Sequence, residues 1–257
     1  MNIEERESRI ELKDTPEKRA NFRVAILGSG AEKTAQDRQA IDRAGKFAGG
    51  SVEKGFSIST GGYSGVMKAA TEAAAEKARQ MGVNPKDRVF AYPMKDAKVF
   101  AELEVKDDDA EKIRSDSVTK RLTGLVGESS AFVVFGGGFG SLTEVLTALE
   151  EERIKKKITP EKPSRPVILI DPSLKHTDTL SQLARAEKKL RDPAITESLY
   201  ILSHNPEAEK IAQEILEQHY QASVGNKPAE GELQKYSAYN LKNFLRNQEN
   251  FQEGSGI

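Results

Sequence analysis

The sequence contains no cysteine and no tryptophan, and only 6% of its residues are aromatic. The lack of cysteine excludes disulfides, thiolate nucleophiles and thiolate-ligated metals, and it fits a reducing compartment, so a cytoplasmic location is expected. Nucleic-acid binding by stacking would need aromatic platforms beside a broad basic patch. The composition therefore argues against a nucleic-acid partner.

The sequence also lacks an excess of either charge and any long apolar run. Lys and Arg total 39 against 40 Asp and Glu, which gives a net charge of −1. Such a balance creates no overall field for nucleic acid or acidic membranes, so any phosphate site must be local. The apolar runs fall far short of the roughly 20 residues that cross a bilayer, and the charged residues 1–20 do not resemble a secretory signal. No membrane partner is expected.

What the chain does contain is an alternation of strand-like and helix-like segments. Short apolar runs rich in β-branched residues predict strands at 23–27, 56–60, 131–135 and 166–170, and weaker ones at 88–92 and 199–202. Helical spacing predicts helices within 36–48, 66–81, 118–126, 142–157 and 208–219. This alternation predicts an α/β fold with a Rossmann-like, doubly wound parallel sheet and helices on both faces.

The chain length suits one substantial core, so a single domain with extensions is predicted. The sequence predicts a charged N-terminal extension at residues 1–20, a nucleotide-binding domain at residues 21–220, and a polar C-terminal tail at residues 221–257 with a short docking helix within 236–244. Residues 95–116 have few apolar anchors and an acidic run, which predicts a solvated connection.

Three of the four strongest strands end directly in glycine-rich turns, at residues 28–30, 61–65 and 136–141. Parallel sheets bind ligands beyond the carboxyl ends of their strands. Glycine lets an anion approach backbone N–H groups, and a following helix N-terminus adds donors. A single glycine turn is as well explained by a tight bend, but three together favour a phosphate site. They match neither the standard dinucleotide fingerprint nor the Walker P-loop.

Two of these turns resemble motifs of the LOG (LONELY GUY) family, labelled lysine decarboxylase-like in older naming. Residues 61–67 resemble its G-G-x-x-G-hydrophobic-M turn, and residues 137–144 resemble its P-G-G-x-G-T-x-x-E signature. The resemblance spans about residues 22–216. Gly136 replaces the family's Pro, Ser141 replaces its Thr, and Leu122 replaces the Lys that follows its catalytic Arg.

The resemblance implies a nucleoside 5′-monophosphate phosphoribohydrolase that releases a free base and ribose 5-phosphate. It implies Arg121 and Glu144 as the catalytic pair, a small-molecule purine nucleotide as ligand, a homodimer, and no cofactor or metal. The substrate and phosphate contacts it implies are Gly28, Ser29, Gly30, Gly61, Gly62, Gly65, Met67, Gly137, Gly138, Phe139, Gly140 and Ser141. The alternative is a non-catalytic nucleotide or molybdenum-cofactor carrier or sensor, or an interaction scaffold.

Both catalytic candidates also have purely structural interpretations. Ser141 and Glu144 have the spacing of a capping box, with Ser141 as N-cap and Glu144 as the third helical residue. Arg121 could be an ordinary exposed helix arginine. The three histidines, His176, His204 and His219, show no metal-ligand spacing and are expected to be structural or surface residues.

Overall fold

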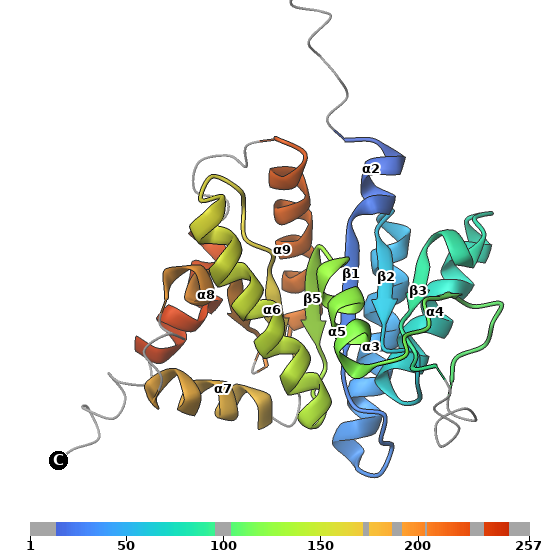
Figure 1. Ribbon diagram of the computed structural model, residues 1–257, viewed down its shortest axis with the longest axis horizontal. Coiled ribbons are helices and arrows are strands. Elements are labelled where there is room, and N and C mark those ends of the chain that lie inside the picture. Colours follow the sequence, from blue (N-terminus) through green and yellow to red (C-terminus); the bar gives the residue numbers. More distant parts are fainter. Residues whose placement is uncertain are drawn as a thin grey trace, which may run out of the picture.

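The computed structural model describes residues 14–95, 104–171, 175–186, 192–203, 205–226 and 234–246. Its strands are β1 (Arg23–Leu27), β2 (Ser57–Thr60), β3 (Val89–Ala91), β4 (Glu111–Lys112), β5 (Ala131–Val134), β6 (Val167–Leu169) and β7 (Leu199–Ile201). They form one parallel sheet in the order β4-β3-β2-β1-β5-β6-β7. Figure 1 labels the neighbouring strands β3, β2, β1 and β5 of this sheet. The prediction of a parallel α/β sheet is confirmed, including its two weaker strands.

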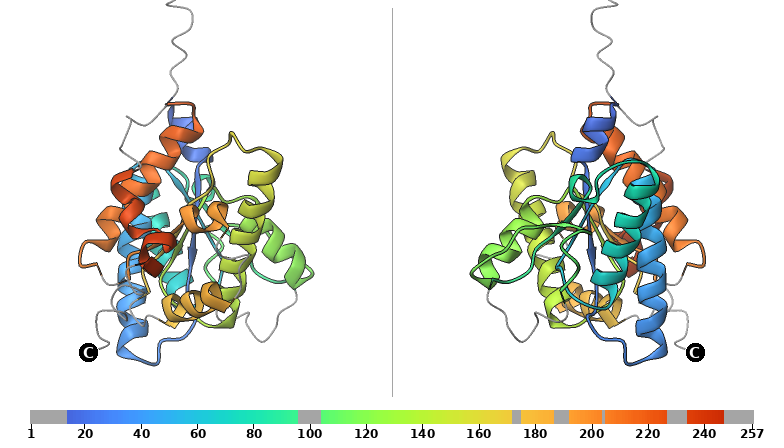
Figure 2. Two further views of the ribbon diagram at one scale, coloured as in Figure 1. Left: turned by 90° about the vertical axis from the view of Figure 1, so that its left-hand side faces the viewer. Right: turned by 90° about the vertical axis from the view of Figure 1, so that its right-hand side faces the viewer.

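Helices cover both faces of this sheet (Figure 2). They are α2 (Pro16–Asn21), α3 (Ala35–Glu53), α4 (Val66–Gln80), η1 (Pro85–Asp87), α5 (Val118–Gly127), α6 (Phe139–Ile158), α7 (Lys175–Ala186), α8 (Pro193–Ser198), α9 (Ala208–Ser223) and η4 (Gln234–Tyr239). One core joins α3, α4 and α9 to the sheet, and a second core joins α5, α6, α7 and α8 to its other face. The fold is a three-layer sandwich, as the doubly wound prediction requires.

The position of β1 in the middle of the sheet explains why its sequence is continuously apolar. Val24 and Ile26 point into the core with α3 and α4, whereas Ala25 and Leu27 point into the core with α5 and α6. Because successive side chains of a strand alternate between faces, a strand buried on both sides carries no polar alternation.

The strand order places a topological switch between β1 and β5. From β1 the chain moves outward through β2 and β3 to β4, then returns to pair β5 with the other side of β1. In open parallel sheets, the crevice at such a reversal is the usual place of a ligand. The glycine turns that follow β1 and β5 both lie at this crevice.

The segment predicted as a solvated connection is partly built into the fold, so that prediction is wrong for its described part. Glu111 and Lys112 form β4 at the edge of the sheet, and Val105 and Ala110 are buried. A strand of two polar residues has no hydrophobic periodicity that the sequence could reveal. Backbone pairing with β3 holds β4 in the sheet. Among the other elements, α2, α7 and α8 were also not predicted.

Residues 234–246 lie against the domain. The Tyr236 hydroxyl donates to Glu214 over 2.6 Å, and the buried side chains Leu241 and Leu245 belong to the core that contains α5 and α6. Residues 241–246 are helical, and Asn240 makes an antiparallel bridge to Tyr200 in the edge strand β7. Within the described ranges, no helix has the length and apolar character to span a bilayer.

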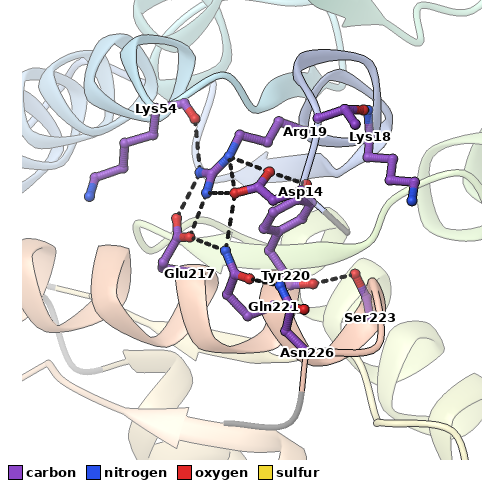
Figure 3. Close-up of polar contacts among 10 residues, drawn as sticks. Asp14, Lys18, Arg19, Lys54, Glu217, Tyr220, Gln221, Ser223 and Asn226 are labelled. Atoms are coloured by element: carbon purple, nitrogen blue, oxygen red, sulfur yellow. Dashed lines mark hydrogen bonds and ion pairs between the residues drawn. The ribbon is translucent and has the colours of Figure 1, made fainter. Parts of the chain in front are cut away.

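A polar cluster ties α2 and the preceding Asp14 to α9, at the end of the sheet where β1 begins (Figure 3). The Arg19 guanidinium lies 2.5 Å from Asp14 and 2.8 Å from Glu217, and it sits 4.7 Å from the centroid of the Tyr220 ring. The Tyr220 hydroxyl donates to Asp14 over 2.6 Å. These contacts hold α2 in place and lie at the opposite end of β1 from the glycine turn that follows it.

This cluster predicts a pH-dependent contribution of Asp14 to stability. Hydrogen bonding to Arg19 lowers the pKa of Asp14 from 3.8 to about 2. A carboxyl whose pKa is lower in the folded state stabilises the protein above its unfolded pKa, and this contribution is lost as the pH falls through the folded pKa. We expect Asp14→Asn to lower the free energy of unfolding by about 1 kcal/mol at pH 7, a value limited by solvent screening.

Urea unfolding at pH values from 7 to 2 measures the effect. The difference between the two proteins should stay constant down to about pH 4 and shrink toward pH 2. A matched control is Asp42→Asn, because Asp42 pairs with Lys46 on an exposed helix face and should contribute only a few tenths of a kcal/mol. A pH-independent difference for Asp14→Asn would contradict the assignment.

Candidate functional site

The turns after β1 and β2 are locked together through their backbones. The Val66 N–H donates to the Ser29 carbonyl over 2.9 Å, and the Ser64 hydroxyl donates to the Gly30 carbonyl over 2.9 Å. Gly65 has a φ of +66°, and a Cβ atom there would lie 2.2 Å from the Ser29 carbonyl oxygen. Only glycine permits this approach, so Gly65 holds the two turns at one edge of the sheet.

The turn after β5 closes against the turn after β1. A Cβ atom on Gly137, whose φ is +132°, would lie 3.1 Å from the carbonyl carbon of Gly28 and 2.3 Å from the Ser141 Oγ. A Cβ atom on Gly28 would in turn lie 2.5 Å from the Val66 side chain. The structure therefore brings the three predicted glycine turns together, with their backbones in direct contact.

Helix α6 begins earlier than the capping-box interpretation requires, so that interpretation is wrong. Its N-cap is Gly138, no described side chain caps it, and Ser141 lies inside the first turn rather than at the cap. Cβ atoms built on Gly138 and Gly140 would meet no described atom within 4 Å, and Phe139 is 85% exposed. The start of this long helix is thus exposed beside these two glycines, and the helix dipole there favours an anion.

Glu144 and Arg121 form an ion pair beside these turns. Arg121 Nη1 lies 3.1 Å from Glu144 Oε1, and Arg121 Nε donates to the carbonyl of Tyr92 over 2.8 Å. The side chains of Arg121 and Glu144 are only 15% and 9% exposed. The interpretation of Arg121 as an ordinary exposed arginine is therefore wrong. Helices α5 and α6 each contribute one partner, and the end of β3 fixes the guanidinium.

Burial dominates the electrostatics of the pair. Desolvation raises the pKa of Glu144, and the opposing charge and hydrogen bond of Arg121 only partly offset that rise. A buried carboxyl with a raised pKa beside a fixed cation is typical of functional sites, although structural ion pairs share the pattern. This carboxylate can accept a proton more readily than an exposed one.

Gly61 and Met67 lie directly against the guanidinium. A Cβ atom on Gly61 would lie 2.2 Å from Arg121 Nη2 and 2.6 Å from Met67 Sδ. The Tyr63 ring centroid lies 5.9 Å from Arg121 Cζ, and the Tyr63 hydroxyl accepts the Met94 N–H. The turn after β2 thus forms one wall around Arg121.

The remaining predicted residues have different surroundings. Gly62, with a φ of +82°, packs against Ala91 and Pro93 at the end of β3, which makes it a turn residue. The Ser29 hydroxyl accepts the Ala31 N–H over 2.9 Å. Leu122 packs against the core, so it supplies no charge beside Arg121.

The other charged and histidine candidates lie apart from the pair. Lys120 is 70% exposed and pairs with Asp116, so no second cation stands beside Arg121 from this helix in the described structure. His219 is buried and lies 3.1 Å from the Tyr200 hydroxyl, and burial lowers its pKa to about 4. His176 is also buried, and His204 lies outside the described residues.

Two residues near the turns were missed by the sequence analysis. Tyr92 follows β3 and supplies the carbonyl that positions Arg121, while its ring packs on Gly124 of α5. Asp171 follows β6 and lines a cavity of about 360 Å³ beside the turn after β5. For Asp171, the available signal was an acidic residue directly after an apolar run, whereas Tyr92 acts through its backbone carbonyl, which no residue type signals.

The chain matches a known protein family over the region that contains this site. The family model described as "Possible lysine decarboxylase" matches residues 64–214, which is more than half of the chain and includes Arg121 and Glu144. No curated protein matches the sequence.

Two solved structures are similar to the chain. The molybdenum cofactor binding protein from Rippkaea orientalis is 19% identical, with a TM-score of 0.51 over 76% of this chain and 94% of that chain. The molybdenum cofactor carrier protein from Chlamydomonas reinhardtii is 17% identical, with a TM-score of 0.49 over 76% of this chain and 98% of that chain. At 19% identity, the likeness to the first of these structures concerns the fold alone.

Proposed function

Because the chain belongs to the LOG family, described as "Possible lysine decarboxylase", we propose that it is a nucleoside 5′-monophosphate phosphoribohydrolase. The observation that carries the proposal is the buried Arg121–Glu144 pair beside an uncapped helix start. The two features offer an anion site and a charged pair to one ligand. A purine nucleotide such as AMP has the matching phosphate and ribose.

The phosphate would bind at the start of α6. The helix dipole and the N–H groups that follow Gly138 favour an anion, and the open space above Gly138 and Gly140 admits one. Binding at this helix start would be local, as the balanced charge of the chain requires. It would also place the sugar next to Glu144, which lies near the start of α6.

The reaction breaks the bond between C1′ of the ribose and a ring nitrogen of the base. As that bond breaks, positive charge develops on the sugar, and the Glu144 carboxylate can stabilise this charge or take a proton from the attacking water. The water oxygen becomes bonded to C1′, and the electron pair of the broken bond leaves with the base, which is then protonated. Arg121 would orient sugar or phosphate oxygens through its planar fork.

The direct test is incubation of the pure protein with a panel of nucleoside 5′-monophosphates and the matching nucleosides. We expect free base and ribose 5-phosphate in equal amounts from at least one monophosphate, resolved by chromatography, and no base from the nucleosides, because these lack the phosphate. The Glu144→Gln protein controls for contaminating hydrolases. Absence of base release from every monophosphate, by folded protein, would refute the proposal.

A second candidate is a non-catalytic nucleotide or molybdenum-cofactor carrier. The observation that favours it is Leu122, which packs against the core where the family has a Lys after the catalytic Arg. A carrier should be stabilised against heat by its ligand through linkage and should return that ligand intact. Base release in the same incubation would exclude this function.

A further inference from the structure

Helix α5, which carries Arg121, is held to the sheet by few apolar side chains. The structure describes each residue of this helix, and among them only Leu125 and Val126 are buried, with Leu122 packed at the margin of the core. All three follow Arg121 along the chain. Apolar packing thus fixes the later part of the helix better than the first turn, where the guanidinium must meet Glu144 on α6.

Tyr92 contacts this helix at three successive positions. Its carbonyl accepts from Arg121 Nε over 2.8 Å, its ring lies against Gly124, and its hydroxyl donates to Glu128 Oε2 over 2.8 Å. Residues 121, 124 and 128 share one face of the helix, because they are three and four positions apart. Tyr92, which is fully buried, therefore lies along that face from the first turn of α5 to its C-cap.

The hydroxyl end of Tyr92 is anchored to the central strand. Arg23, the first residue of β1, donates through Nη1 to the Tyr92 hydroxyl over 2.8 Å and lies 2.6 Å from Glu128. The Arg23 Cζ also lies 3.7 Å from the centroid of the Phe90 ring. The hydroxyl thus accepts one hydrogen bond and donates another. Burial raises the pKa of Tyr92, so the hydroxyl stays protonated and remains a donor.

Gly124 lets α5 lie close to the Tyr92 ring. A Cβ atom on Gly124 would lie 3.1 Å from the ring carbons Cδ1 and Cε1, which is tighter than ordinary van der Waals contact. Gly127 in the same helix differs, because a Cβ atom there would meet no described atom within 4 Å. Glycine inside a helix costs roughly 1 kcal/mol relative to alanine. The close approach at Gly124 is therefore kept against helix propensity.

We propose that Tyr92 is a positioning residue for Arg121, which it holds beside Glu144 by fixing α5 through its carbonyl, ring and hydroxyl. The effect on rate rests on the proposed phosphoribohydrolase activity, whereas the placement of Arg121 does not. If these contacts loosen, the guanidinium withdraws from Glu144. The pKa of Glu144, which burial raises and Arg121 lowers, then rises further.

Two variants loosen these contacts in different ways. Tyr92→Phe keeps the ring and the carbonyl but removes the hydroxyl. Gly124→Ala adds a methyl group that must displace α5 or the ring by a few tenths of an ångström. The matched controls are Tyr220→Phe, which removes a buried hydroxyl that donates to Asp14 over 2.6 Å, and Gly127→Ala. Thermal unfolding establishes that each variant is folded.

Two measurements report the position of Arg121. NMR of protein with isotope-labelled glutamate carboxyls gives the pKa of Glu144, whose signal is assigned by its loss in Glu144→Gln. Steady-state kinetics on the most active monophosphate gives kcat/KM. We expect Tyr92→Phe and Gly124→Ala to raise the pKa of Glu144 and to lower kcat/KM by about tenfold, because a misplacement of about 1 Å at a reacting group can cost about 10²-fold in rate. Both control variants should match the wild-type protein in these measurements.

Combination with Arg121→Met separates positioning from a general structural effect. No guanidinium remains to be positioned in that background, so adding Tyr92→Phe should change neither the pKa of Glu144 nor kcat/KM any further. Residues that act through one another show such non-additive effects, whereas independent sites add.

An unchanged pKa of Glu144 in the folded Tyr92→Phe and Gly124→Ala proteins would overturn the positioning role, even if the wild-type protein releases base. Equal effects of Tyr92→Phe with and without Arg121→Met would also overturn it. If the wild-type protein releases no base but the pKa of Glu144 rises in both variants, the positioning role stands and the hydrolase proposal fails. If Tyr92→Phe does not fold, Gly124→Ala against Gly127→Ala decides the question.

Discussion

Glu144→Gln is expected to reduce the rate of base release by about a hundredfold or more. The amide keeps the length of the side chain and an oxygen that can accept from Arg121 Nη1, but it removes the negative charge and the basic oxygen. Electrostatic stabilisation and proton transfer each commonly contribute factors of about 10² or more. Steady-state kinetics on the most active monophosphate of the panel measures the loss.

Stability should respond far less than activity. Because Glu144 is buried and its pKa is raised by desolvation, replacing it with a neutral amide removes a carboxylate that is unfavourably solvated. We expect a change in the free energy of unfolding of no more than about 1–2 kcal/mol. A folded Glu144→Gln protein with near-normal turnover would show that the carboxylate is only structural.

Glu152 offers a matched control on the same helix. It is 3% exposed and accepts from Arg165 Nε over 2.5 Å, but it lies two turns beyond Glu144, at the other end of the sheet from the glycine turns. Glu152→Gln should destabilise the protein at least as much as Glu144→Gln and leave turnover nearly unchanged. The two variants together separate loss of a buried ion pair from loss of catalysis.

Arg121→Lys is expected to reduce kcat/KM by about a hundredfold although it keeps the positive charge. Lysine is a single donor group on a flexible stem, so it cannot both donate to the Tyr92 carbonyl and hold a planar fork toward Glu144. A misplacement of about 1 Å at a reacting group can cost about 10²-fold in rate. Arg165→Lys, at a buried ion pair away from the site, is the control for general destabilisation.

A second substitution at the same position predicts a change in pH dependence. The charge of Arg121 lowers the pKa of Glu144 against the larger effect of burial. Activity that needs the ionised carboxylate is lost as the pH falls through that pKa, so Arg121→Met should move the acidic limb of the pH–rate profile to higher pH. An unchanged limb, with measurable residual activity, would mean that Glu144 does not titrate in the rate-determining step.

The sequence was sufficient for the parallel sheet because burial on both faces leaves an unambiguous apolar run, as in β1 and β5. It was insufficient for β4, which is held by one edge pairing rather than by its own hydrophobic pattern. The short helices α2 and α8 were missed for a similar reason, since six residues give too little periodicity to recognise.

Local sequence also misplaced the start of α6. The spacing of Ser141 and Glu144 suited a capping box, but the glycines let the helix begin at Phe139 and left Glu144 free to meet Arg121. The pairing of these two residues was implied by family resemblance and by no local pattern. Asp171 was missed because its place beside Gly136 depends on β6 lying next to β5, which is a property of strand order.

The two edge strands of the sheet, β4 and β7, affect whether the molecule can pair with strands of other chains. An unpaired strand edge is a template on which another chain can add a strand, which is a common route to aggregation. Here β4 has only two residues, both charged. On the other edge of the sheet, Tyr200 in β7 makes an antiparallel bridge to Asn240. Residues 234–246 therefore do more than extend the domain: they cover the edge at which uncontrolled strand addition would otherwise begin.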